Sequence, residues 1–279
     1  DGSIYFTDIP NNAIHRYDPA TGETTLFTDD SGGANGLMFW QSHLWACAGD
    51  VGAVHCYPGR TDRHFTVNEE GQTVLVAEDW RGLNGNTFEP LFSFDKFEGK
   101  RFNKPNDIVS SAHGFYFTDP VYGREFEMVQ PSEAVYMLRL VDPDDQDFIV
   151  LRLIDDLVRP NGIGLSPDEQ ALYVNDNGDK KIWAYPIPEP GSVGEGRLLN
   201  DLADLGGPDG MTVGPRGRIY TTIYGKGVLI LSPEGERLGF IETGPQTTNC
   251  AFGADGKTLY VTAEKSLKRI VLNTGVDAE

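Results

Sequence analysis

Five side chains that end in an amide or carboxylate oxygen recur at the same place in a repeated sequence pattern. We call them the anchors: Asn35, Asn106, Asn161, Asp209 and Asn249. An aromatic residue in a strand-like segment follows each anchor after 10 to 12 residues, in the order Trp45, Tyr116, Tyr173, Tyr220 and Tyr260. This regular spacing indicates that one structural unit is used repeatedly, and that each unit places an oxygen-bearing side chain at the same point.

Three of the anchors also follow a proline, in Lys104-Pro105-Asn106-Asp107, Arg159-Pro160-Asn161-Gly162 and Gly207-Pro208-Asp209-Gly210. A single Asn-Gly or Asp-Gly pair usually marks a turn, so any one anchor is open to that interpretation. Three anchors in one register predict a shared site instead. Amide and carboxylate oxygens suit a hard cation such as calcium or magnesium. The five histidines are scattered and show no spacing typical of zinc ligands.

The aromatic strands begin with the copy at Tyr5 and return with a base period of about 40 residues, interrupted by insertions. This period is typical of a propeller built from four-stranded blades, and six copies predict six blades. We therefore expect an all-β fold, a single six-bladed β-propeller domain over residues 1–279. The innermost strand of each blade lines the central channel. The anchors, which precede that strand, should converge in a ring at one mouth of the channel.

The two ends of the repeat do not match. The first copy begins at its second strand, Ser3 to Thr7, and the sixth ends after its third strand, Leu267 to Val271. We expect the chain to be an N-terminally truncated form of a longer one, with the first blade's inner strand and the last blade's outer strand missing. The longest insertion, Glu78 to Phe97, is either a loop over the channel mouth or a surface excursion that packs its own aromatic residues.

The amino-acid composition limits the classes of partner that we expect this chain to bind. The 279 residues carry a formal net charge of −19, which disfavours nucleic acid because phosphate binding needs a basic face. No apolar run approaches the ~20 residues of a membrane helix, so we expect no membrane partner and a soluble protein of the cytoplasm or the periplasm. The three cysteines lack CxxC spacing and are expected to be buried thiols, with a Cys47–Cys56 pair as the alternative. The oligomeric state stays open.

Five short motifs are specific when taken together: Arg101 to Asp107, Phe117 to Gly123, Pro160-Asn161-Gly162, Ser166-Pro167-Asp168 and Pro208-Asp209-Gly210. Through them the chain resembles the SMP-30/gluconolactonase/luciferin-regenerating-enzyme-like family of six-bladed propellers. The resemblance covers essentially the whole chain. Ala34-Asn35-Gly36-Leu37 also looks like the second blade of bacterial gluconolactonases.

The resemblance implies one divalent metal ion, usually calcium, at the channel mouth. By position, Asn161 and Asp209 look like the family's amide and carboxylate ligands. Asn106 looks like the residue that contacts the metal or the substrate. The family's remaining ligand is a glutamate in a Glu-Gly-Pro-like motif, which the register places before Asp1.

The reaction implied by the resemblance is hydrolysis of a sugar lactone, a small-molecule substrate. The metal polarises the lactone carbonyl and stabilises the oxyanion. Asp209, or Asp107 as a second carboxylate, takes the proton of the attacking water. Arg101, Asn103 and Tyr122 are candidates to hydrogen-bond sugar hydroxyls.

Other interpretations stay open at this point. Arg101 fits a surface ion pair equally well, and Tyr122 fits a packing role. The whole chain could be a propeller that only binds a protein partner, although such a module would not need the ring of anchors. It could also be a related propeller enzyme of the strictosidine-synthase-like or arylesterase-like kind. No GxSxG elbow for a nucleophilic serine is present.

Overall fold

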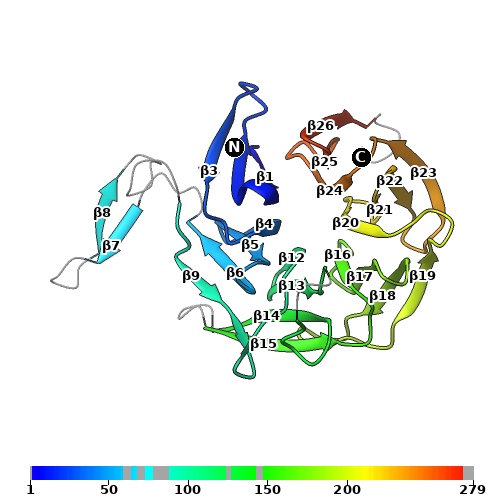
Figure 1. Cartoon of the computed structure of the whole chain (residues 1–279), viewed down its shortest axis with the longest axis horizontal. Helices are drawn as coiled ribbons and strands as arrows, with labels where there is room; N and C mark the ends of the chain where they lie inside the picture. The colour runs from blue at the N-terminus through cyan, green and yellow to red at the C-terminus, as the bar shows by residue number, and fades with distance from the viewer. Residues whose placement is uncertain are drawn as a thin grey trace.

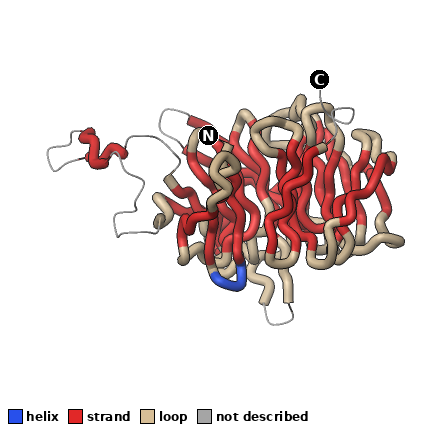
Figure 2. Tube along the Cα trace, turned by 90° about the horizontal axis from the view of Figure 1, so that it is seen from above, coloured by secondary structure: helices blue, strands red, loops and turns tan. Residues whose placement is uncertain are grey.

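A computed structural model describes residues 2–58, 64–67, 73–77, 88–123, 127–142 and 147–272. Its main strands form six antiparallel sheets that stand around a common axis as the blades of a propeller, which confirms the predicted fold class (Figure 1). Seen from the side, the strands run between two edges of a disc, and turns gather at both edges (Figure 2). Blades 1 and 6 meet where the rings of Tyr17 and Tyr260 lie 6.2 Å apart.

The blades follow one another in chain order. Blade 1 contains β1 (Ile4–Asp8), β2 (Ala13–Tyr17) and β3 (Thr24–Thr28). Blade 2 contains β4 (Ala34–Trp40), β5 (His43–Ala48), β6 (Ala53–Tyr57) and β9 (Phe92–Phe94). Blade 3 contains β12 (Ile108–Ser111), β13 (Gly114–Asp119), β14 (Ala134–Asp142) and β15 (Asp147–Ile154). Blade 4 contains β16 (Pro160–Leu165), β17 (Ala171–Asp176), β18 (Lys181–Pro186) and β19 (Arg197–Asp201). Blade 5 contains β20 (Pro208–Val213), β21 (Ile219–Ile223), β22 (Gly227–Leu231) and β23 (Arg237–Glu242). Blade 6 contains β24 (Thr247–Phe252), β25 (Thr258–Ala263) and β26 (Ser266–Val271). Two short hairpins complete the described strands: β7 (His64–Val67) with β8 (Thr73–Ala77), and β10 (Lys96–Phe97) with β11 (Lys100–Arg101).

The long insertion was predicted wrongly in part, because Phe92–Phe94 is the outer strand of blade 2. This strand, β9, pairs with β6. The rings of Phe92 and Phe94 lie 5.6 and 6.2 Å from the ring of Trp45 and cover the apolar face of that blade. Residues 78–87, where the rest of the proposed mouth loop falls, lie outside the described residues.

The second strands of blades 3 and 5 lie in the core, since all residues of β13 and of β21 are buried. Neighbouring blades cover both faces of such a strand. In β13, Phe115 packs 4.4 Å from the ring of Trp45 in blade 2, whereas Tyr116 joins an apolar cluster with β16 and β17 of blade 4. The aromatic residues that mark the repeat therefore form the core between blades, where such rings stabilise most through the area that they bury.

The three cysteines are buried and free, as expected for thiols outside a disulfide framework. The described part of the chain contains one short 3-10 helix, Ile9–Asn11. No helix within that part is long and apolar enough to cross a membrane.

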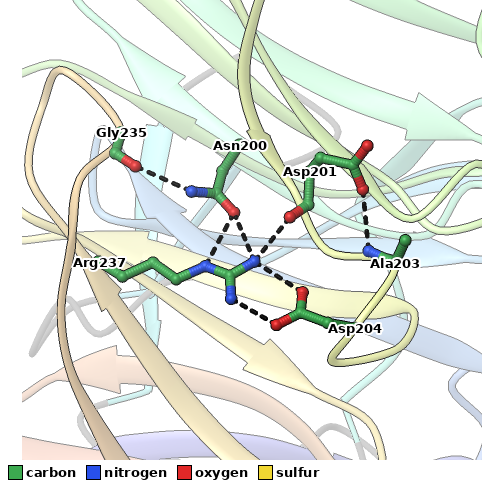
Figure 3. A network of polar contacts seen from close by, with 6 residues as sticks. All are labelled: Asn200, Asp201, Ala203, Asp204, Gly235 and Arg237. Atoms are coloured by element: carbon green, nitrogen blue, oxygen red, sulfur yellow. Dashed lines mark hydrogen bonds and ion pairs between the residues drawn. The ribbon is translucent and has the colours of Figure 1, made fainter.

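One arginine joins the outer strands of blades 4 and 5 (Figure 3). Arg237 makes a bidentate ion pair with Asp204, at 2.7 and 2.8 Å, and donates to the backbone oxygen of Asp201 at 2.6 Å. Asn200 accepts from the same guanidinium and donates to the carbonyl oxygen of Gly235 at 2.9 Å. Hydrogen bonds from Arg237 lower the pKa of Asp204 to about 2. These contacts connect the outer strands of blades 4 and 5 at the rim of the disc.

Four of the five anchors lie inside their inner strand rather than before it, which corrects their predicted placement. The pairing of β4, β16 and β20 skips two residues, between Ala34 and Leu37, Pro160 and Ile163, and Pro208 and Met211. In each case the skipped residues are the anchor and the glycine after it. A smaller shift precedes Asn249 in β24. Such bulges re-aim a side chain out of the regular alternation of a strand, so they turn the anchors away from the blade cores.

Glycine after the anchor lets neighbouring inner strands approach closely. A Cβ on Gly162 would overlap the carbonyl oxygen of Asp209 and lie 2.6 Å from Nδ2 of Asn175. A Cβ on Gly210 would overlap the amide of Asn249 in the next blade. Any side chain at these two positions would therefore push adjacent blades apart.

Alanine at position 162 tests this packing. We expect Gly162→Ala to lower the free energy of unfolding by about 1–3 kcal/mol, because the added methyl group forces a backbone shift. The matched control is Gly239→Ala in the exposed strand β23, where a Cβ would meet only Ile230 at an ordinary 3.9 Å. Urea unfolding of both variants measures the difference. Equal stabilities would contradict close packing at the ring.

Candidate functional site

Hydrogen bonds between blades hold the anchors in one ring. In three cases a side chain of a second strand donates to the main-chain oxygen at the next blade's anchor. The bonds are Thr118 Oγ1 to Asn161 O (2.7 Å), Asn175 Nδ2 to Asp209 O (2.6 Å) and Thr222 Oγ1 to Thr248 O, beside Asn249 (2.8 Å). The position of an anchor is thus set by the preceding blade as well as by its own.

An aspartate at the end of the second strand holds the turn that leads into the anchor of the same blade. The carboxylate of Asp119 accepts the N–H groups of Asn103 and Lys104 at 2.9 and 2.8 Å. Asp176 accepts the N–H of Val158 at 3.2 Å in the same way. Burial raises the pKa of Asp119 to about 7, although the two N–H donors oppose the shift. The pair Thr118-Asp119 therefore helps to position Asn161 and Asn106. The pair Asn175-Asp176 likewise helps to position Asp209 and Asn161.

Asp107 is buried inside the ring, at the position where three other blades have glycine. A Cβ on the corresponding Gly36 of blade 2 would lie 2.5 Å from Oδ1 of Asp107. That oxygen accepts the N–H of Ile108 at 3.0 Å and Nδ2 of Asn249 at 3.4 Å. Among the described residues, Oδ2 of Asp107 is buried and has no hydrogen-bond partner. Oδ1 of Asp107 thus faces blades 2 and 6, and a backbone interaction with Ile163 of blade 4 opposes the rise in the pKa of this carboxyl.

The amide of Asn161 is oriented by its neighbours. Its Nδ2 donates to the hydroxyl of Tyr122 at 2.5 Å, and the interaction of the Asn161 side chain with Asp209 opposes the rise in the pKa of that carboxyl. Oδ1 is buried and, within the described ranges, lacks a donor. A buried polar atom without a partner is uncommon in native proteins and indicates a missing ligand, water or ion.

The two carboxyl groups of the ring influence each other. Burial raises the pKa of Asp209 to about 7, and the hydrogen bond from Asn161 opposes the shift. The pKa of Asp107 is also raised to about 7, by burial first and then, against the effect of its N–H donors, by the charge of Asp209. Like charges in a dry site disfavour double ionisation. A proton or a cation is therefore needed to compensate the negative charge of these two buried carboxylates.

The donor set of the ring is chemically compatible with a hard divalent cation. The ring offers carboxylate and amide oxygens, which calcium and magnesium prefer. The backbone of Asn106 is fixed by Thr118 (N–H to O, 2.8 Å) and by Gly36 (N–H to the oxygen of Asn106, 2.7 Å), which keeps this anchor in the same ring. Over the described ranges, no group of three or more His, Cys, Asp and Glu side chains is arranged to hold a metal. Amide oxygens would therefore have to complete the coordination.

Two predicted substrate residues take up main-chain contacts. Asn103 is buried, and its Oδ1 accepts the N–H groups of Val129 and Gln130, both at 2.9 Å. Its Nδ2 donates to the oxygen of Ser132 at 3.0 Å. These bonds brace the segment after Tyr122 and leave Asn103 little capacity for a sugar hydroxyl.

Arg101 is exposed and donates to the carbonyl oxygens of Phe102 and Asn103 at 3.2 and 3.1 Å. Its remaining guanidinium donors stay available at the surface. Tyr122, by contrast, is joined directly to an anchor through Asn161. Of the three proposed substrate residues, the structure brings Tyr122 closest to the ring.

Comparison with known proteins decides the family. The sequence pattern described as the SMP-30/gluconolactonase/LRE-like region matches residues 1–265. The chain belongs to this family. This SMP-30/gluconolactonase family member is 32% identical to a gluconolactonase of Zymomonas mobilis over 288 aligned residues. The alignment covers 97% of this chain and 75% of that protein.

Two further relatives agree with the assignment. Regucalcin of Xenopus laevis is 30% identical over 277 residues, covering 94% of this chain and 79% of regucalcin. A solved structure of a gluconolactonase from Xanthomonas campestris superimposes with a TM-score of 0.75 at 24% identity, covering 97% of this chain and 82% of that one. At 24% identity, this structural similarity shows that the two proteins share a fold.

The raised pKa values predict how stability depends on pH when metal is removed. The carboxyls of Asp107 and Asp209 have a pKa of about 7 in the folded protein, against a reference value of 3.8. The folded state therefore binds more protons than the unfolded state between these values. In chelator, we expect the free energy of unfolding to fall as pH rises from about 4 to about 7, and to level off above.

Urea unfolding at several pH values, with chelator and with added calcium, measures this effect. Calcium should restore stability mainly at the upper end of the range, where the two carboxylates are ionised. Asp209→Asn should make the pH profile shallower, because it removes one of the titrating groups. If the free energy of unfolding depends on pH in the same way in this variant and in the parent protein, Asp209 is not one of the titrating groups.

Proposed function

We propose that this family member hydrolyses a sugar lactone with the help of one divalent cation, with calcium as the first candidate. The 32% identity with a gluconolactonase supports a lactone as the substrate class. The observation that carries the cation is a pair of buried oxygens, Oδ1 of Asn161 and Oδ2 of Asp107, which have no hydrogen-bond partner among the residues that the structure describes. Asn106, Asn161 and Asp209 would hold the ion.

The bound cation would supply Lewis acidity to polarise the lactone carbonyl. The chain's own residues prepare the place for it. Tyr122 accepts a hydrogen bond from Nδ2 of Asn161 and so fixes the orientation of this amide. Thr118 holds the main-chain oxygen of Asn161 at 2.7 Å. The amide is thus positioned before any ligand arrives, which lowers the ordering cost of binding.

The attacking water needs a proton acceptor, and Asp209 is our first candidate. Its side chain is partly exposed, and burial raises its pKa to about 7 in the ion-free ring, so this carboxyl group can take up a proton near neutral pH, although a bound cation would lower that pKa. Asp107, fully enclosed next to it, is the second candidate. Because the charge of Asp209 raises the pKa of Asp107, the two carboxyls hold about one proton between them near neutral pH.

Tyr122 would contact the substrate. Its oxygen accepts the hydrogen bond from Asn161, so the phenolic hydrogen is left to donate to a sugar hydroxyl. Burial raises the pKa of Tyr122 and keeps the phenol protonated, as a donor must be. Arg101 could offer its remaining N–H groups from the surface.

A turnover assay tests the proposal. The protein is incubated with glucono-δ-lactone and a panel of neutral sugar lactones, and the acid released is followed after chelation and after addition of calcium, magnesium, manganese or zinc. We expect chelation to abolish turnover and at least one of these cations to restore it. Turnover that survives complete chelation would contradict the role of the cation. Absence of turnover with every lactone and every ion would leave a binding module as the alternative.

Asp209→Asn is the decisive variant. We expect kcat to fall by at least about a hundredfold, because the change removes a proton acceptor and a negative charge from the ring. Calcium affinity, measured by calorimetry, should fall in the same variant. Asp29→Asn, at an exposed position of blade 1, is the matched control for the loss of one negative charge. A similar loss of turnover in both variants would point to bulk charge rather than to the ring.

A further inference from the structure

Arg159 stands next to the ring and plays no part in the reaction proposed above. Its guanidinium lies 5.6 Å from the centre of the Tyr122 ring, on the face of that ring. The hydroxyl of the same tyrosine touches Asn161. The negative charge of Asp209 raises the pKa of Tyr122, and the positive charge of Arg159 lowers it. The guanidinium therefore lies at the same end of the channel as the anchors, with Tyr122 between them.

The backbone of Arg159 is pinned in a conformation that favours glycine. Its φ is +66°, in the left-handed region. The N–H of Arg159 donates to Oε2 of Glu133 at 2.9 Å, while Oε1 of Glu133 accepts the N–H of Val121, next to Tyr122, at 2.6 Å. The carbonyl oxygen of Arg159 accepts the N–H of Asn177 at 3.1 Å. One carboxylate thus sets Arg159 and Tyr122 side by side.

Gly33, two residues before the anchor of blade 2, is also in the left-handed region, with φ of +69°. Glycine would meet the backbone requirement in blade 4 without strain. Arginine at this point costs some conformational free energy, as do the eight other non-glycine residues of positive φ within the described ranges. The strain alone therefore identifies no role for the side chain, and the role follows from the surroundings of the guanidinium.

The guanidinium of Arg159 is exposed and has no ion-pair partner among the described residues. Both oxygens of Glu133 are already occupied by backbone N–H groups. Lys104, which precedes the anchor proline of blade 3, is instead paired with Asp50 at 3.3 Å. The guanidinium of Arg159 is therefore a positive charge beside the ring that is available to a ligand, in a chain of net charge −19.

We propose that Arg159 is a specificity-determining residue, which selects sugar lactones bearing an anionic group away from the lactone carbonyl. This inference rests on the proposed lactonase function. A guanidinium offers parallel N–H donors that match a carboxylate or a phosphate in bidentate fashion. The cation–π contact with Tyr122, at 5.6 Å, restricts the guanidinium, which reduces the entropy lost when the anion binds. The acidic surface would otherwise repel such a substrate.

A binding experiment tests Arg159 without relying on turnover. Calorimetry in calcium chloride compares three open-chain acids: gluconate, glucarate, which has a second carboxylate, and the phosphate ester of gluconate at its terminal carbon. The two acids that carry a second anionic group distinguish a carboxylate from a phosphate as the preferred group. We expect at least one of them to bind the parent protein more tightly than gluconate. Arg159→Gln should reduce that preference by roughly tenfold to a hundredfold.

Two further variants sharpen the result. Arg197→Gln removes the same charge from the exposed outer strand of blade 4, and we expect it to keep the preference for the second anion. Arg159→Lys keeps the charge and loses the planar fork, so it should retain only part of the preference. Steady-state kinetics with glucono-δ-lactone and its phosphate ester should show the same order in kcat/KM.

The outcomes separate this inference from the proposed function. Equal binding of the three acids by the parent protein, or no binding of any, overturns the role of Arg159. An equal loss for all three acids in Arg159→Gln, or a full effect of Arg197→Gln, also overturns it. Failure of every lactone to turn over would refute the lactonase proposal alone, because the comparison of acids would still show whether Arg159 reads an anion.

Discussion

The close approach of the inner strands at the ring is the constraint on which the rest of the site depends. At Gly162 and Gly210, the main chain or anchor of the next blade fills the space that a Cβ would need. Second-strand side chains such as Thr118 and Asn175 then reach the main-chain oxygens of the following anchors. Each anchor is therefore placed by two blades. A change in the spacing of any pair of blades would move oxygens on both sides, which explains why a site for chemistry sits where packing is tightest.

The spacing between anchor and aromatic residue was enough to predict the six blades, because both belong to one blade and their separation is a local property. The spacing could not predict that the anchors lie in bulges. A bulge is defined by pairing with a partner strand, and pairing register is a tertiary property. The outer strand β9 was missed for a related reason. Phe92 pairs opposite Cys56 across a long insertion, so the repeat of the sequence is interrupted at that point.

The residues that support the ring were harder to find than the ring itself. Asp119 ends a second strand directly after Thr118, and Asp176 does so after Asn175, so the pairs are visible in the sequence. Their roles are not visible, since Thr118 bonds a residue 43 positions later. Glu133 joins two backbone segments that only the fold brings together. Asn103 shows the opposite problem. The sequence indicated a polar side chain near the site, whereas only the structure shows that its amide is already bonded to backbone.

Asp107 shows how a structural repeat acquires chemistry. Blades 2, 4 and 5 follow the anchor with glycine, which closes the ring and adds no function. In blade 3 the same position carries a carboxyl group, which is buried and has one unpartnered oxygen. None of the groups that shift its pKa is a cation. A buried carboxylate without a counter-charge is unfavourable, so either a proton or a bound ion must compensate it. A lysine in the ring would have stabilised Asp107 permanently, but it would also have excluded a cation. Amide neighbours such as Asn249 hold the carboxylate in place without neutralising it. Asp107 is thus a buried carboxyl group whose charge needs a proton or an ion to compensate it, and neutral neighbours hold it in place.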